Sequence, residues 1–191
     1  MNPALTLVLV LLVIAAVGAL VYLYIRDRRT KQLRARFGPE YTRAVNEFGD
    51  RDKAETSLQR RAQRVKSFAI RPLAPDETAH YASVWRRIQA DFVDNPRDAV
   101  SHADALLTDV MSARGYPVTD FEQASADLSV HYPGVVQNYR AAHEIALRHK
   151  RGEAGTEDLR QAMIAYRSLF DALVSETRPE PRDLPRQPVM H

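Results

Sequence analysis

The sequence of 191 residues contains no cysteine, and its seven glycines are scattered along the chain. The absence of cysteine excludes a disulfide-stapled fold, thiolate catalysis and cysteine zinc sites. A P-loop needs closely spaced glycines ahead of Lys-Ser/Thr, and a dinucleotide site needs GxGxxG, so neither phosphate-binding loop is present. No serine lies in a GxSxG pattern. Nucleophilic catalysis therefore has no visible carrier in this sequence.

Charge is absent from the first 25 residues, because all 27 Lys and Arg and all 24 Asp and Glu residues follow them. Residues 5–25 form an apolar run of 21 residues, which as an α-helix spans about 31 Å and matches the hydrocarbon core of a bilayer. No second run approaches this length, which excludes a polytopic transporter or channel. The sequence predicts a short N-terminus over residues 1–4 and one transmembrane helix over residues 5–25.

A cleavable signal peptide is the alternative interpretation of the apolar run. Such a peptide has a basic segment ahead of an apolar stretch of about 7–15 residues. Residues 1–4 contain no Lys or Arg, and cleavage near Gly18 would leave an apolar new N-terminus. We therefore expect the helix to be retained as an anchor.

A basic juxtamembrane segment, residues 26–38, follows the apolar run. Its Lys and Arg residues are Arg26, Arg28, Arg29, Lys31, Arg34 and Arg36. Basic residues beside a span stay on the cytoplasmic side, so we expect the soluble part of the chain there. The same side chains can hold anionic headgroups of the lipid bilayer, although their effect on orientation is a sufficient explanation for them.

The basic excess is confined to the membrane-proximal third of the chain. Residues 26–75 carry 14 basic and 6 acidic side chains, whereas residues 76–191 carry 13 and 18. A basic patch raises nucleic acid as a partner, but this one lies beside the lipid and lacks the interleaved aromatic residues of a single-strand binder. We therefore do not expect a nucleic acid partner.

Between glycine and proline breaks the apolar residues recur at helical spacing, and no run alternates long enough for a sheet. The sequence predicts an all-α protein, in which a soluble bundle of five or six helices follows the transmembrane helix. Residues 39–71 are expected to form a long charged helical arm, with Gly49 a break or kink in it, and residues 72–176 the bundle domain. Residues 177–191 contain four prolines and are expected to be a disordered tail with a PxxP pattern.

Several residue types mark expected helix ends. Asn95 before Pro96 is typical of a helix start, and Thr119 with Glu122 has the spacing of a capping box. Thr156 is expected to precede another helix. Gly115 suits the left-handed position that closes a helix.

The loop Arg114-Gly115-Tyr116-Pro117 is the most distinctive of the breaks. Its simpler interpretation is a helix stop in which Tyr116 packs back on the preceding turn. Its functional interpretation is an interaction loop that presents Arg114 and Tyr116 on a rigid corner.

No catalytic, cofactor-binding or metal-binding residue is predicted. His143 and His149 flank Glu144, but a spacing of six places the two rings on opposite sides of a helix, which does not fit a zincin site. His143 lies on an apolar stripe and is expected to be a core histidine with a hydrogen bond.

Seven segments resemble a family of uncharacterised bacterial proteins that have one N-terminal transmembrane helix and a helical remainder. They are RFGPEY (36–41), RPL (71–73), FVD (92–94), RGYP (114–117), DLSV (127–130), YRAAH (139–143) and TEDLRQAM (156–163). The resemblance implies a location in the bacterial inner membrane. It carries no catalytic or binding residues.

The first functional hypothesis is a non-enzymatic, membrane-tethered module that binds a protein partner. The second is a small-molecule-binding bundle or an enzyme of unrecognised type. Its pocket would be lined by Tyr81, Trp85, Tyr139, Met163 and Tyr166, although these positions also fit plain core packing. The third is a homo-oligomer formed through residues 39–69.

Overall fold

The computed structural model describes residues 3–175, which form eight α-helices and no strand. The helices are α1 (Pro3–Phe37), α2 (Pro39–Phe48), α3 (Arg51–Val65), α4 (Pro75–Asp91), α5 (Pro96–Ala113), α6 (Phe121–Leu128), α7 (Val136–Lys150) and α8 (Thr156–Ser175). The predicted all-α architecture, a long apolar N-terminal helix followed by a helical bundle, is confirmed. The predicted tail, residues 177–191, lies outside the described residues.

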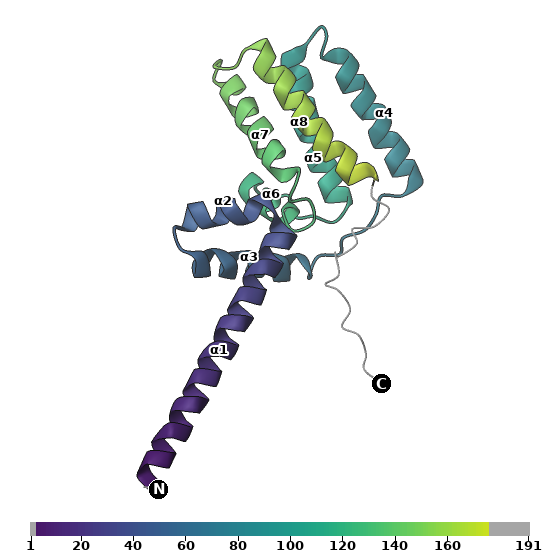
Figure 1. Ribbon diagram of the computed structural model, residues 1–191. Coiled ribbons are helices and arrows are strands. Elements are labelled where there is room, and N and C mark those ends of the chain that lie inside the picture. Colours follow the sequence, from purple (N-terminus) through teal and green to yellow (C-terminus); the bar gives the residue numbers. More distant parts are fainter. Residues whose placement is uncertain (1–2, 176–191) are drawn as a thin grey trace.

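Helix α1 continues without a break from the apolar run through the basic segment to Phe37. Its N-terminal part projects away from the other helices (Figure 1). The large apolar side chains described there are all more than half exposed, with Leu20 at 67%. The stretch Leu9–Phe37 contains a segment long and apolar enough to cross a membrane, a property that membrane anchors share with signal sequences.

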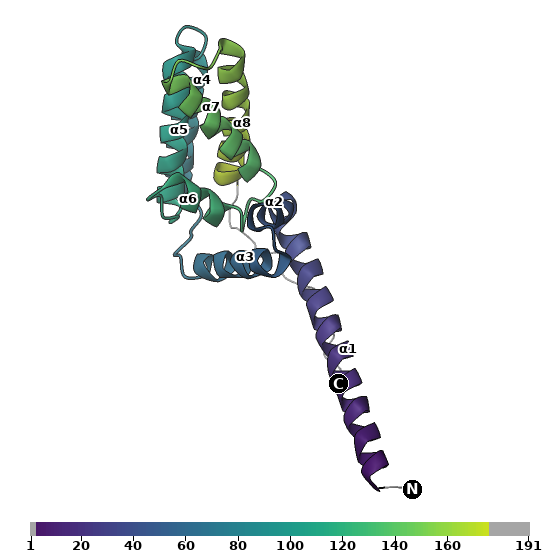
Figure 2. The ribbon, with the colours of Figure 1, turned by 90° about the vertical axis from the view of Figure 1, so that its left-hand side faces the viewer.

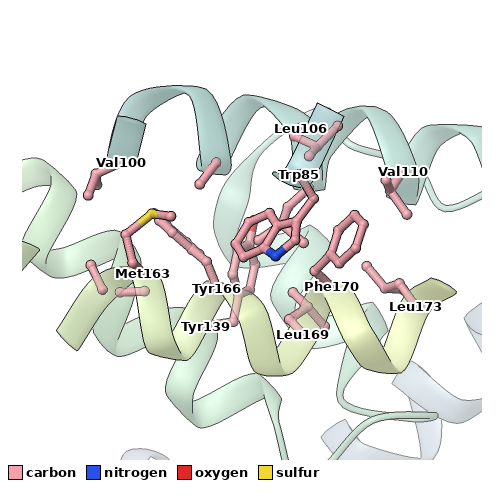
Figure 3. Packing of buried hydrophobic residues seen from close by; sticks show 14 of the residues in the cluster. Trp85, Val100, Leu106, Val110, Tyr139, Met163, Tyr166, Leu169, Phe170 and Leu173 are labelled. Atoms are coloured by element: carbon pink, nitrogen blue, oxygen red, sulfur yellow. The ribbon is translucent and has the colours of Figure 1, made fainter. Parts of the chain in front are cut away.

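Two hydrophobic cores lie beyond the exposed part of α1. The larger core is built mainly by α4, α5, α7 and α8, where the rings of Trp85 and Phe170 stack with centroids 4.9 Å apart (Figure 3). The smaller core joins α1, α2 and α3 and also receives Val130. Phe37, the last residue of α1, is fully buried in the smaller core. The C-terminal end of α1 is therefore an integral part of the fold.

Residues 39–71 do not form the expected single arm. Helix α2 ends at Gly49, whose φ of 63° lies in the left-handed region, and α3 begins after Asp50, whose carboxylate accepts a hydrogen bond from the Lys53 amide. The two helices fold back on each other as a hairpin beside the end of α1 (Figures 1 and 2). Their apolar faces are buried in the smaller core. Tyr41, Leu58 and Val65 are thus covered within one chain, whereas Phe48 remains exposed, and self-association through residues 39–69 stays a prediction.

Seven helices follow α1 in the described part of the chain, one more than the expected maximum. The additional helix is α6, whose eight residues are too few to display a repeating apolar stripe. Its N-cap is Asp120, which accepts a hydrogen bond from the Gln123 amide, one residue after the predicted cap Thr119. The predicted start of α5 after Asn95 is confirmed, as is the left-handed Gly115 with its φ of 89°.

Candidate functional site

The six basic residues of the juxtamembrane segment lie on about three turns of α1 directly after the apolar run, where α1 enters the smaller core. Three of them form ion pairs: Arg26 with Asp52, Arg29 with Glu55, and Lys31 with Asp27. The other three lie over aromatic rings: Arg28 over Tyr24, Arg34 over Tyr41, and Arg36 over Phe37. Arg28, Lys31, Arg34 and Arg36 remain exposed, so their charges still face the surroundings of α1.

Glu55 of α3 is the hub of the junction between α1 and the α2–α3 hairpin. Its side chain is 2% exposed, and one of its oxygens accepts hydrogen bonds from the hydroxyl groups of Thr30 at 2.7 Å and Tyr41 at 2.8 Å. The guanidinium groups of Arg51 and Arg29 lie 3.2 Å and 3.7 Å from the carboxylate oxygens. Each of the three helices therefore contributes a polar group to one buried contact.

Burial alone would raise the pKa of Glu55. The hydrogen bonds from Thr30, Tyr41 and Arg51 outweigh that effect and hold the pKa below its ordinary value of 4.5. The carboxylate is thus ionised at neutral pH. A sequence signal for this role does exist, since Glu55 lies three residues before Leu58 on the apolar stripe of α3, where a carboxylate is out of place.

An open cleft of about 520 Å³ lies between the α2–α3 hairpin and helices α6 and α7. Its walls hold five arginines, from three different helices: Arg43, Arg60, Arg61, Arg64 and Arg140. Three carboxylates also line it: Glu47, Asp120 and Glu122. The cleft therefore has a dense and mixed charge, with arginine the commonest residue.

Two buried carboxylates hold the arginines at the base of this cleft. Glu40 is fully buried and pairs with Arg140 of α7, while its second oxygen lies 3.9 Å from Arg61 of α3. Asp127 of α6 is also fully buried and accepts a hydrogen bond at 3.2 Å from Arg64. These pairs join the two cores through charged groups, beside the apolar contacts of Ile70, which packs against both cores.

Burial governs the pKa values of the ionisable groups at the base of the cleft. Burial lowers the pKa of Arg140, and the nearby charges of Arg43 and Arg61 lower it further, while Glu40 acts in the opposite direction. Burial raises the pKa of Asp127 even though Arg64 opposes the change. The sequence does not predict this site, because its arginines come together only in the fold; the adjacent pair Arg60 and Arg61 is the one local signal for it.

The structure does not present Arg114 and Tyr116 as an interaction loop. Arg114 is fully buried and donates a hydrogen bond to the backbone carbonyl of Leu173 at the end of α8. Tyr116 is 3% exposed, and its hydroxyl lies 2.7 Å from Nδ1 of His131. The helix-stop interpretation of this loop holds, because both side chains pack inward.

The aromatic positions proposed to line a pocket serve the larger core instead. Trp85, Tyr139, Met163 and Tyr166 are buried, and Figure 3 shows them packed among the aliphatic side chains of α5 and α8. Tyr81 is partly buried against the same core. The arginine-lined cleft lies elsewhere, so this set does not define the candidate site.

Among residues 3–175, one carboxylate of the larger bundle, Asp104 of α5, lies beside a histidine, His143 of α7. It accepts a hydrogen bond at 2.9 Å from Tyr166, and Nδ1 of His143 lies 3.5 Å away. The His143 ring stacks on Phe121 with centroids 3.6 Å apart. Within residues 3–175 no group of three or more metal-ligating side chains converges.

No protein-family model matches the chain, and neither does any curated protein or any solved structure.

Proposed function

We propose that this protein is a membrane-tethered binding module, with α1 retained in the bilayer and the helical domain on the cytoplasmic side. The observation that carries the proposal is the continuity of α1. The helix passes directly from its exposed apolar part into the smaller core, where Leu33 and Phe37 are buried. Cleavage near Gly18 would leave the exposed apolar residues 20–25 as a stub on this built-in helix, and this favours retention of the whole helix in a bilayer.

The continuity of α1 also implies a rigid tether. Phe37 follows Ile25 by 12 residues, which corresponds to about 18 Å along a helix. The Glu55 network fixes this part of α1 against the hairpin. The domain is then held at a set distance from the membrane and at a set rotation about α1, which suits a module that must meet a membrane-bound or membrane-proximal protein partner.

The proposed orientation rests on the six basic residues of the juxtamembrane segment. Four of them are exposed on α1 directly beyond the apolar run, which is where the positive-inside rule counts Lys and Arg. The same positions suit contact with anionic headgroups, at about 1 kcal/mol per basic residue close to the surface. A bacterial inner membrane, implied by the resemblance noted above, is part of this proposal.

The tether is tested by paired C-terminal fusions in a bacterial host. We expect a green fluorescent protein fusion to be bright and an alkaline phosphatase fusion to be inactive. Mass spectrometry of the membrane fraction should show a chain that still contains residues 5–25. A processed N-terminus, or activity of the phosphatase fusion alone, would overturn the proposal.

The binding role is tested by crosslinking in intact membranes followed by affinity purification. We expect a reproducible protein partner whose crosslinks map to the domain. A second variant tests the rigid tether. Two residues inserted after Ile25 rotate the domain by about 200° about the axis of α1, which should change the positions on the domain that crosslink to the partner. A domain that repeatedly captures no protein, while turning over or binding a metabolite, would favour the small-molecule alternative instead.

A further inference from the structure

The arginine-lined cleft lies where the α2–α3 hairpin meets α6 and α7. Its walls come from both sides of the polar interface between the two cores: Arg43, Arg60, Arg61 and Arg64 belong to the hairpin, whereas Arg140 belongs to α7. Clefts between packed units are common locations of ligand sites, and about 520 Å³ lies within the range of small-molecule pockets, about 300–1,000 Å³. The volume is enough for a small phosphorylated molecule.

The arginines of the cleft fall into two groups. Arg61, Arg64 and Arg140 are held by the buried carboxylates Glu40 and Asp127. These three form the fixed base of the cleft. The ion pairs hold these guanidinium groups in place and offset their charge, so the three contribute preorganised N–H donors and not unpaired charge.

Arg43 and Arg60 form the second group. Neither has a carboxylate within ion-pair distance or a side-chain hydrogen bond among residues 3–175, although both line the cleft. Arg43 and Arg61 line the same cleft as Arg140, and their like charges repel that of Arg140 and lower its pKa. A bound anion would relieve that repulsion.

We propose that this cleft binds a phosphoryl group, as a phosphate monoester or a diphosphate, between Arg43 and Arg60 on the hairpin and Arg140 on α7. The planar guanidinium fork matches the geometry of phosphate oxygens, and such charge-assisted hydrogen bonds are about twice as strong as neutral ones. The phosphoryl group can come from a soluble metabolite or from a lipid headgroup, because α3 begins beside Arg26 at the end of the apolar run.

The carboxylates at the rim give the proposal a second, independent consequence. Asp120 is committed as the N-cap of α6, whereas Glu47 and Glu122 are exposed and line the same cleft. A phosphoryl ligand is repelled by these two side chains, so their removal should strengthen binding. A ligand of mixed charge, such as a peptide, would use them and should bind more weakly without them.

The test uses the full chain in neutral detergent micelles, titrated with sodium pyrophosphate in a calorimeter. We expect saturable binding that weakens about tenfold or more in the double variant Arg43→Gln/Arg60→Gln. The matched control is Arg86→Gln/Arg97→Gln, which removes the same charge from exposed positions on α4 and α5 and should leave the affinity unchanged. Neither arginine of the test variant holds a buried carboxylate, and circular dichroism verifies that both variants keep their helices.

Three outcomes overturn the proposal: no saturable pyrophosphate binding, equal loss in the test and control variants, or weaker binding in Glu47→Gln/Glu122→Gln. Nanodiscs separate the two sources of the phosphoryl group. The affinity of the wild type for pyrophosphate is measured in discs of phosphatidylcholine alone and in discs that also contain phosphatidylglycerol. If phosphatidylglycerol weakens pyrophosphate binding, the ligand is a lipid headgroup; if it has no effect, the ligand is soluble. Pyrophosphate binding in micelles does not depend on how the protein lies in a membrane. A failure of this test can therefore be told apart from a failure of the proposed tether, which the fusion experiments measure.

Discussion

Replacing Glu55 should uncouple α1 from the α2–α3 hairpin while leaving the larger bundle intact. Thr30 and Tyr41 are 2% and 4% exposed, and both donate to the same carboxylate oxygen. In Glu55→Ala both hydroxyl groups lose their buried acceptor, at about 1–3 kcal/mol each. We therefore expect a loss of about 3–5 kcal/mol in local stability, the range found when one partner is removed from a buried charged contact.

The variant Glu55→Gln isolates the contribution of the charge. Its amide oxygen remains an acceptor for Thr30 and Tyr41, but these hydrogen bonds become neutral and about half as strong. We expect a loss of about 1–2 kcal/mol, because the partner arginines are partly exposed and stay hydrated. Glu144→Ala, on the exposed face of α7, serves as the control and should change nothing.

Hydrogen–deuterium exchange with mass spectrometry measures this effect by region. Protection of amides in α2 and α3 should fall by about a hundredfold or more in Glu55→Ala, since each 1.4 kcal/mol is about tenfold. Amides of α5 and α8 should keep their protection, because their contacts belong to the larger core. Unchanged protection of the hairpin, or an equal loss in α8, would refute the role assigned to Glu55.

The contribution of Glu55 should also depend on pH in a definite direction. Its pKa in the folded protein lies below the ordinary value of 4.5, so the folded form binds its proton less readily than the unfolded form. The stabilisation is then complete above about pH 4.5 and is lost as the pH falls through the folded pKa. The difference in unfolding free energy between the wild type and Glu55→Gln should be constant at neutral pH and narrow in acid.

Three further changes test other parts of the fold by urea unfolding. Gly115→Ala should cost about 1–3 kcal/mol or more, because φ is 89° and a Cβ would lie 2.5 Å from the backbone oxygen of Ala69; a neutral effect would contradict the observed turn. Phe37→Ala should cost about 3–5 kcal/mol, since this ring is fully buried at the end of α1. A loss far below that range would mean that α1 is not anchored in the smaller core. Asp120→Ala removes the cap of α6 and should cost about 1 kcal/mol, with Asp120→Asn retaining most of the stability.

Periodicity predicted the apolar faces of the helices well. Leu58, Ala62, Val65 and Ala69 recur at helical spacing; the first three are buried in the smaller core, whereas Ala69 lies beyond the end of α3 and is exposed. The break at Gly49 was also visible, yet the direction in which the chain turns there was not. That direction depends on what the hairpin packs against, and the partner surface on α1 is set by tertiary contacts that a local pattern does not contain.

The charged residues of the candidate sites were beyond sequence reasoning for a different reason. Residue type alone assigns Arg, Asp and Glu to the surface, but Arg114, Glu40 and Asp127 are buried. Their partners lie far away in the chain: Arg140 is 100 residues from Glu40. Without homologous sequences or a fold, nothing in the spacing of these residues links them. The cleft could be recognised only after α2, α3, α6 and α7 were placed together.

The way in which the two cores are joined bears on how the module can work. Apolar contacts between them are few, and the buried pairs of Glu40 and Asp127 with arginines carry much of the interface. Buried ion pairs add little net stability compared with apolar packing, yet they favour one geometry, because a displaced partner leaves an uncompensated charge. The bundle is therefore held in a defined orientation relative to α1 by these pairs. A phosphoryl ligand bound between Arg43 and Arg60 of the hairpin and Arg140 of α7, as proposed, would bridge the two sides of this interface and reinforce that orientation.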